Sequence, residues 1–323
     1  MSKNVALVLA SGGSRGLAHI GAIEALLERG YKITSLAGTS MGALVAGLYA
    51  AGGLDSFEEW MRGVDRRKVF SLMDFTLSTK GFVKGNKVIE ELKELVKDVL
   101  IEDLPIPYAA VATDIRHRKE VVFEEGSLYE AIRASISMPT IFTPHIIGDM
   151  LLIDGGVVNP VPIDKVKRTP GDILVVVDLN GPYIKESSEE VVEHPSVFSE
   201  TIDIIDDYFE NLKNKVESFV DSFKSDEQLQ SEAEYQNHIQ KVGSEPDDMN
   251  VVEIMQESSS LMLQVIADKM IEHFPPDVLV RIAKNAYSTL EFYKFEEICA
   301  FTDSTCAGTN FAVYVSFFVA LNV

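Results

Sequence analysis

A chain of 323 residues, of which 46% are hydrophobic and 24% are charged, can bury a large core, and this excludes a wholly disordered protein. The formal net charge of −21 weighs against nucleic-acid binding, because phosphates demand a basic face. Two cysteines are too few for a disulfide framework, and no Cys/His cluster has zinc spacing, so a reducing cytoplasm is the simplest setting. No stretch reaches the roughly 18 to 20 apolar residues of a membrane span, so any membrane contact is expected to be peripheral.

The first fifty residues predict an α/β fold. Residues 5–10 are a continuous apolar run that leads into glycines, which is typical of a strand buried on both faces of a parallel sheet. A helix closed by a glycine is expected over 22–30, a second strand over 33–37 and a second helix over 43–50. Strands that alternate with helices in this way are typical of α/β proteins.

A glycine-rich loop with Gly12, Gly13, Ser14, Arg15 and Gly16 follows the first strand. It is no phosphate-binding loop, because no Gly-Lys-Ser/Thr follows, and it does not match the Gly-x-Gly-x-x-Gly of dinucleotide-binding proteins. The remaining interpretation is an oxyanion hole, in which the glycines leave backbone N–H groups unobstructed. Arg15 either holds the shape of this loop, attracts an anionic head group or makes a structural salt bridge.

The second strand and second helix flank the pentapeptide from Gly38 to Gly42, with Ser40 at its centre. A sharp turn between a strand and a helix is what a nucleophile elbow requires, and it would point the Ser40 hydroxyl outward. The small residues Gly38 and Gly42 let neighbouring backbone approach closely. The free N–H groups of the following helix favour an anion at this place. The pentapeptide alone could arise by chance, and the strand-turn-helix context favours the elbow.

The middle of the chain continues the alternation of helices and strands. Residues 54–82 are expected to form helices and connecting loops near the site entrance, without chemistry of their own. The next predicted elements are a helix over 86–99, strands over 107–114 and 119–123, and a helix over 128–135.

A hairpin over 146–156 is expected to deliver Asp154 at the end of its second strand. A carboxylate followed by two glycines is also a common turn, so Asp154 considered alone indicates only a loop cap. The six histidines show no spacing that marks one of them as the base for Ser40. His19 lies just beyond the glycine loop, where helix packing also explains it.

The last part of the chain changes composition. After a predicted strand over 172–180, residues 185–248 hold eighteen acidic and five basic residues. An apolar stripe within this segment predicts a helix that either packs on the core or acts as a mobile lid over an acyl pocket; it consists of Ile202, Ile205, Phe209, Leu212, Val216, Phe219 and Phe223. Residues 225–250 are expected to be a solvated linker.

Two C-terminal features complete the prediction. A helix over 253–274 is expected, with core positions at Ile254, Leu261, Leu263, Val265 and Ile266. The apolar residues 311–321 are too few to span a membrane, so they are a strand, a packed tail or a membrane-surface contact.

Four motifs together resemble the patatin-like phospholipase family in their order and rough intervals. They are Gly12-Gly13-Ser14-Arg15-Gly16, Gly38-Thr39-Ser40-Met41-Gly42, Ala134-Ser135-Ile136-Ser137-Met138-Pro139 and Asp154-Gly155-Gly156. The residues from Pro275 to Val280 look like the closing strand of that family. The resemblance implies a three-layer α/β sandwich, with a mostly parallel central sheet between helices.

The resemblance also implies a mechanism based on two side chains. Ser40 would attack an ester carbonyl, Asp154 would accept its proton, and the backbone of Gly12, Gly13 and Ser14 would hold the oxyanion. Water would then release a fatty acid from the acyl-enzyme. No metal or organic cofactor is implied, and the partner is a lipid ester substrate.

We therefore expect a catalytic core over 1–182, an acidic helical insertion or lid over 183–250, and C-terminal elements over 251–323 that complete the core. The expected activity is that of a serine lipid acyl hydrolase of the phospholipase A or lysophospholipase type. Two alternatives stay open at this point: an esterase or thioesterase on another acyl substrate, and a non-catalytic regulatory protein of the same fold.

Overall fold

The computed structural model describes residues 3–72, 75–78, 81–139, 141–182, 251–287, 291–300 and 313–317. The chain divides into two compact units, Met1–Ser187 with Leu261–Val323, and Ser188–Ser260. In the second unit only the start of helix α9 (Val251–His273) is described. The predicted acidic insertion or lid, its apolar stripe and the linker lie outside the described residues, so the three predicted domain boundaries stay predictions.

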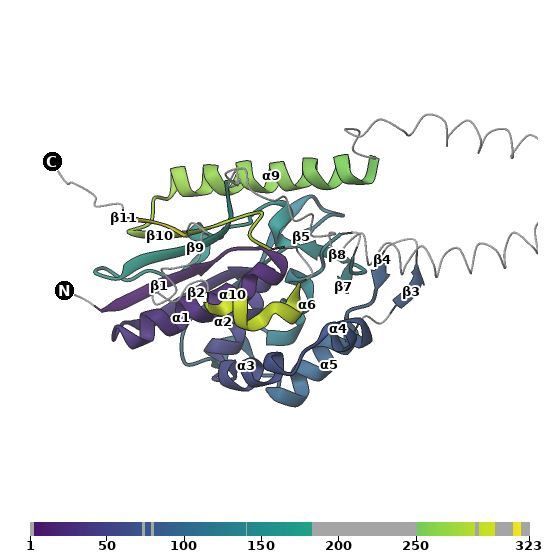
Figure 1. Cartoon of the computed structure of the whole chain (residues 1–323), viewed down its shortest axis with the longest axis horizontal. Helices are drawn as coiled ribbons and strands as arrows, with labels where there is room; N and C mark the ends of the chain where they lie inside the picture. Colours follow the sequence, from purple (N-terminus) through teal and green to yellow (C-terminus); the bar gives the residue numbers. More distant parts are fainter. Residues whose placement is uncertain are drawn as a thin grey trace, which may run out of the picture. The chain divides into compact units, whose positions relative to one another are not determined.

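A nine-stranded sheet forms the centre of the first unit (Figure 1). Its five central strands run parallel, in the order β10 (Val278–Ala283), β9 (Ile173–Gly181), β1 (Asn4–Leu9), β2 (Lys32–Thr39) and β5 (Tyr108–Asp114). Antiparallel strands extend it on both sides: β11 (Val313–Phe317) beside β10, β6 (Lys119–Phe123) and β8 (Met150–Asp154) beside β5, and β7 (His145–Ile147) beside β8. The predicted strands and the predicted hairpin are therefore confirmed.

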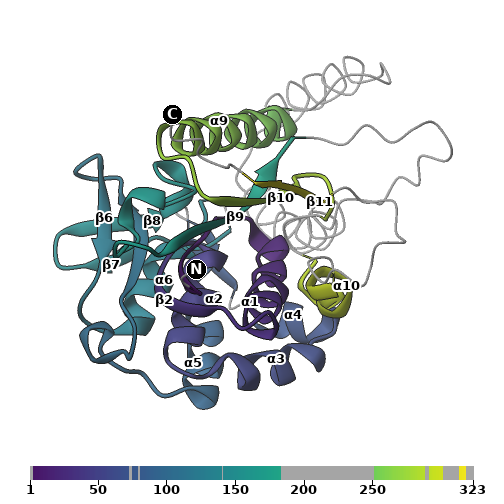
Figure 2. The ribbon, with the colours of Figure 1, turned by 90° about the vertical axis from the view of Figure 1, so that its left-hand side faces the viewer.

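Alternating side chains of β1 explain why helices cover both faces of this sheet. Leu7 and Leu9 pack in the cluster that contains α1 (Ala18–Glu28) and α2 (Met41–Ala50). Ala6 and Val8 point the other way, into a second cluster that contains Ala267 of α9. Both sets are fully buried, as expected for a strand in the middle of three layers. Figure 2 shows the sheet edge-on between these helices. The α/β three-layer prediction is confirmed.

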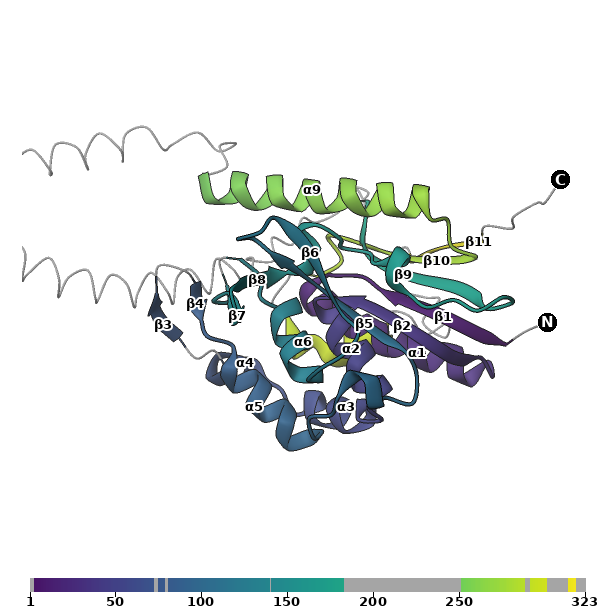
Figure 3. The same cartoon turned by 180° about the vertical axis from the view of Figure 1, so that it is seen from behind.

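The remaining helices extend the α1–α2 layer (Figure 3). They are α3 (Leu54–Arg62), α4 (Arg66–Leu72), α5 (Asn86–Leu95), α6 (Leu128–Ser135) and the short α10 (Phe295–Ala300). Short 3₁₀ turns are η1 (Gly13–Leu17), η2 (Ile101–Asp103), η3 (Gly155–Val157), η4 (Ile163–Lys165) and η5 (Phe292–Lys294). No helix in the described ranges is long and apolar enough to cross a lipid bilayer.

Three expectations need correction or refinement. The region 54–82 contains a two-stranded sheet, β3 (Phe75–Ser78) with β4 (Gly81–Val83), whose strands are too short to give a periodic signal. In α9, Ile254, Leu261 and Val265 are exposed, contrary to the prediction, whereas Ala267 and Ile271 are buried. The helix therefore packs through a different stripe from the one predicted. Within the apolar C-terminal run, the five residues of β11 are a strand.

Candidate active site

Ser40 occupies the turn between β2 and α2. Its φ of 57° and ψ of −125° lie where non-glycine residues are rarely found, as expected for a strained nucleophile elbow. A Cβ atom on Gly42 would lie 2.0 Å from the carbonyl oxygen of Leu9, and one on Gly38 would lie 2.4 Å from the backbone of Gly42. The start of α2 therefore packs against the sheet at distances that only glycine permits at these two positions.

The strand β5 explains how Asp154 reaches Ser40 from a distant part of the chain. Thr39, the last residue of β2, pairs with Val111, and Asp154, the last residue of β8, pairs with Ala112. Because β6 pairs along the same stretch of β5, β2 and β8 must both approach β5 from its other edge. Their ends meet at consecutive residues of β5, which brings the Asp154 side chain next to Ser40.

The carboxylate of Asp154 lies in a buried and incompletely paired environment. Its Oδ1 accepts a hydrogen bond of 2.7 Å from the backbone N–H of Gly156, whereas Oδ2 is buried and accepts none of standard geometry. Burial raises the pKa of Asp154 to about 6, and the neighbouring Ser40 hydroxyl and the Gly156 N–H oppose that shift by stabilising the charge. Oδ2 is thus the acceptor that remains open to the Ser40 hydroxyl.

The C-terminal end of α6 and the residues just after it hold the backbone of both Ser40 and Asp154. The Ser135 hydroxyl accepts a hydrogen bond of 2.8 Å from the Ser40 N–H and donates one of 2.6 Å to the carbonyl of Val111. Two residues further on, the carbonyl of Ser137 accepts a hydrogen bond of 2.9 Å from the Asp154 N–H. Sequence reasoning recognised this segment as a motif but assigned it no role. The two serines at the end of this helix could have indicated the role, because the hydroxyl of a buried serine must find a hydrogen-bond partner.

The Ser135 contacts lead to a prediction about activity. Ser135→Ala leaves the Ser40 N–H and the Val111 carbonyl without this partner, so we expect kcat to fall by about 10- to 100-fold and unfolding free energy by about 1–3 kcal/mol. Ser127→Ala is the matched control, because Ser127 caps the other end of the same helix by accepting from the Glu130 N–H. The control should lose about 1 kcal/mol of stability and no activity. Equal kcat values for both variants in an ester hydrolysis assay would exclude a role for Ser135 at the elbow.

The glycine-rich loop lies beside the start of α2. Gly13 has a φ of 58°, and a Cβ atom on Gly16 would lie 2.3 Å from the Cβ of Met41, the residue after Ser40. The N–H groups of Gly12 and Gly13 donate to no acceptor in the part of the chain that the structure describes. Among the described residues, these two N–H groups are therefore unpaired donors.

The charged and polar members of this loop are buried. Ser14 is fully buried, and Arg15 is 7% exposed. The Arg15 guanidinium donates a hydrogen bond of 2.8 Å from Nη1 to the carbonyl of Tyr287. This contact ties the loop to the C-terminal part of the first unit.

His19 has a packing role in the fold. Its ring is fully buried, and Nε2 lies 2.8 Å from the carbonyl oxygen of Ala10, to which the neutral ring donates. Burial lowers the pKa of His19 to about 4, so the ring stays neutral near pH 7. The hydrogen bond joins the start of α1 to the end of β1.

Among the described residues, no three or more His, Cys, Asp or Glu side chains form a group that could hold a metal ion.

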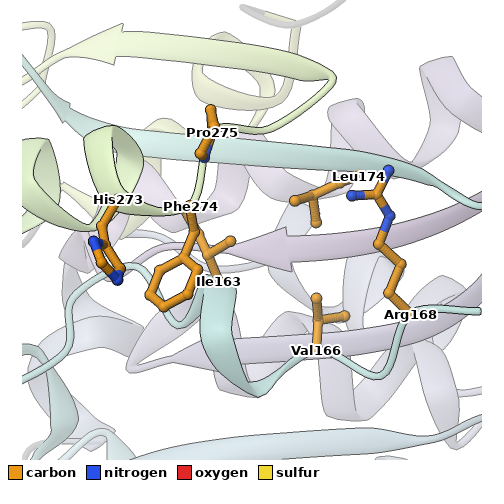
Figure 4. A pocket seen from close by; sticks show the side chains of 7 residues that line it. All are labelled: Ile163, Val166, Arg168, Leu174, His273, Phe274 and Pro275. Carbon is orange, nitrogen blue, oxygen red and sulfur yellow. The ribbon is translucent and has the colours of Figure 1, made fainter. Parts of the chain in front are cut away.

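A pocket of about 290 Å³ lies at the end of the parallel strands that is opposite to Ser40 (Figure 4). Its lining residues are Ile163, Val166, Arg168, Leu174, His273, Phe274 and Pro275. None of them is a candidate site residue. Leu174 precedes Asn180 by six positions on β9, which separates the pocket from the loop end of that strand by about 20 Å. This pocket is therefore separate from the site around Ser40.

The family comparison covers the part of the chain that carries this geometry. The model of the family described as patatin-like phospholipase matches residues 7–167, which include all four motifs. Residues 7–167 are therefore a patatin-like phospholipase domain. The family is one of lipid hydrolases, which supports the hydrolase class expected from the motifs.

Relatives in the patatin-like phospholipase family match the same part of the chain. An uncharacterised NTE family protein of Mycobacterium bovis is 46% identical over 180 residues, which are 56% of this chain and 50% of that protein. Patatin-like phospholipase domain-containing proteins of Caenorhabditis elegans and Mus musculus are 35% and 32% identical over 186 and 184 residues, which in each case are 54% of this chain and 13% of the relative. The matched region thus spans about half of the mycobacterial relative.

Among solved structures, VipD from Legionella pneumophila is similar with a TM-score of 0.36 and 16% sequence identity. The similarity covers 67% of this chain and 55% of that one. This likeness is too distant to bear on the site.

Proposed function

We propose that this chain is a serine lipid acyl hydrolase of the phospholipase A or lysophospholipase type, with Ser40 as nucleophile and Asp154 as base. The observation that carries the proposal is the pairing of β2 and β8 with consecutive residues of β5, which brings a strained serine and a buried carboxylate together. The patatin-like phospholipase domain over residues 7–167 supports the lipid class of the substrate.

In the proposed acylation step, Ser40 Oγ bonds to the ester carbonyl carbon while its proton passes to Asp154 Oδ2. The carbonyl oxygen becomes an oxyanion that the N–H groups of Gly12 and Gly13 bind. When the intermediate collapses, the bond to the alcohol breaks and the alcohol takes the proton from Asp154. Water then attacks the acyl-enzyme by the same route, which releases the fatty acid and restores the Ser40 hydroxyl.

The pKa of Asp154 is central to this proposal. An ordinary carboxylate, with a pKa near 4, is a weak base for a serine hydroxyl. Burial raises the pKa of Asp154 to about 6, which brings it closer to the operating pH and strengthens it as a proton acceptor. Because Oδ1 already accepts a hydrogen bond from the Gly156 N–H, we expect Oδ2 to accept the proton of the Ser40 hydroxyl.

The test is fatty acid release from phosphatidylcholine and lysophosphatidylcholine vesicles, compared with a series of short acyl thioesters. We expect release from the lipids by the wild type and by a Ser71→Ala control, which changes an exposed serine on α4. Ser40→Ala should reduce release to background. Undiminished release by Ser40→Ala would refute the proposed nucleophile, and turnover of thioesters alone would refute the lipid substrate.

A further inference from the structure

On the face of β9 that points toward α9, the last two residues are polar, although the preceding residues on that face are apolar. Leu174 and Val176 point into the cluster between the sheet and α9. By the alternation of a strand, Asp178 and Asn180 share that face, and both are almost completely buried. Buried polar side chains at the end of an apolar row need an explanation, since each must be hydrogen-bonded to be tolerated.

The partner of Asn180 is the peptide that leads into the glycine-rich loop. The last ladder bond of β1 runs from the Ala10 N–H to the Val177 carbonyl at 3.0 Å. Beyond it, Asn180 Nδ2 donates to the carbonyl of Ser11 at 3.1 Å, and the Ser11 N–H donates to the Pro160 carbonyl at 2.9 Å. Beyond the last main-chain hydrogen bond of β1, the Asn180 side chain therefore holds the backbone at Ser11.

A charged pair fixes the orientation of the Asn180 amide. Asp178 Oδ1 accepts from the backbone N–H of Asn180 at 2.9 Å and from its Nδ2 at 3.2 Å. The other carboxylate oxygen of Asp178 accepts from Arg281 Nε at 2.9 Å across the β9–β10 pairing. Both neighbours of Nδ2 are acceptors, so the amide must present its NH₂ group to Ser11.

This hydrogen bond acts on the candidate oxyanion donor through the peptide plane. The Ser11 carbonyl and the Gly12 N–H belong to one planar trans peptide and point in opposite directions, so fixing the carbonyl fixes the N–H. A hydrogen bond to the carbonyl also polarises the peptide and strengthens its N–H as a donor. We propose that Asn180, oriented by Asp178 and Arg281, is a positioning residue that aims the Gly12 N–H at the oxyanion. This inference rests on the proposed hydrolase function.

The test compares Asn180→Leu with Thr34→Val. Leucine has the same number and branching of side-chain heavy atoms as asparagine but cannot donate a hydrogen bond. Thr34→Val removes a side-chain hydrogen bond of 3.1 Å to the Val5 carbonyl at the far end of β1. For a soluble nitrophenyl ester, we expect Asn180→Leu to lower kcat by about 10- to 100-fold with KM within about twofold. A trifluoromethyl ketone, whose adduct carries an oxyanion, should bind more weakly by the same factor. Thr34→Val should change neither value.

Two further outcomes keep the inference separate from the proposed function. Hydrogen exchange of the peptide over 11–16 needs no turnover, and it should be faster in Asn180→Leu than in the wild type or Thr34→Val. A wild type without Ser40-dependent hydrolysis would refute the function, while the exchange result would still decide whether Asn180 holds the loop. If Asn180→Leu does not fold, Asn180→Ser, whose hydroxyl is too short to reach Ser11, should give the same changes. Unchanged kcat, ketone affinity and exchange would overturn the inference.

Discussion

In an Asp154→Asn variant, ester hydrolysis is expected to fall by about 10³-fold or more, because an amide cannot accept the proton of the Ser40 hydroxyl. The substitution keeps the shape of the side chain, and its remaining oxygen can still accept from the Gly156 N–H. The loss should therefore lie in kcat, with KM little changed, because no contact to the bound substrate is removed. Steady-state kinetics on a soluble nitrophenyl ester measure both values.

The same substitution should make the protein more stable at pH 8. Burial raises the pKa of Asp154 to about 6 in the folded chain, whereas an unfolded aspartate titrates near 4. Folding the ionised carboxylate therefore costs free energy above pH 6, and the cost vanishes below about pH 4, where both states are protonated. We expect the unfolding free energy of Asp154→Asn to exceed that of the wild type by about 1–3 kcal/mol at pH 8 and to equal it at pH 4. Denaturant melts at the two pH values measure this difference.

Asp172→Asn provides a matched control with the opposite sign. Hydrogen bonds from the side chain and the backbone of Thr169 lower the pKa of Asp172, near the start of β9. This carboxylate contributes stability above its unfolded pKa, and the contribution is lost as the pH falls. Asp172→Asn should therefore lower stability at pH 8 and leave kcat unchanged. If Asp154→Asn instead kept a tenth of the activity or lost stability as Asp172→Asn does, Asp154 would be a structural residue.

The pH dependence of kcat/KM should show an acid limb centred near pH 6. Only ionised Asp154 can accept the Ser40 proton, and the pKa of this carboxyl is raised to about 6. Activity should be half-maximal there and fall tenfold per unit at lower pH, so that at pH 4 it is about 100-fold below the plateau. Initial rates between pH 4 and pH 8.5 measure this limb, and circular dichroism over the same range serves as the check that the fold is retained.

The position of the limb separates Asp154 from His19, which is also buried and titratable near the loop. The pKa of His19 is lowered to about 4, so an effect of its protonation would be centred two units below the limb expected for Asp154. A profile that stays flat down to pH 5 would contradict the assignment of Asp154 as the base.

Local patterns were sufficient to predict most of the fold. The apolar run of β1, the glycine-flanked serine before α2 and the alternation of β8 each carry their signal within about ten residues. The predicted strand-turn-helix at Ser40 and the hairpin that ends in Asp154 are confirmed as elements. Short strands such as β3 and β4 were missed because three or four residues are too few to show a period.

The parts of the site that could not be predicted depend on register. Nothing local in β2, β5 or β8 says that Thr39 and Asp154 pair with consecutive residues of β5. The same holds for Ser135, whose hydroxyl meets the Ser40 N–H only after α6 has packed beside α2. The contact of Asn180 with Ser11 likewise joins two strand ends that are far apart in the sequence. Such contacts follow from tertiary packing, which a single sequence does not reveal.

The most direct test of the Ser40–Asp154 pair is to trap the nucleophile with a fluorophosphonate and to locate the adduct by mass spectrometry of peptides. We expect one adduct, on the peptide that contains Ser40, formed rapidly by the wild type and far more slowly by Asp154→Asn. An adduct on another serine, or labelling of Ser40 that does not slow when Asp154 is replaced, would contradict the account.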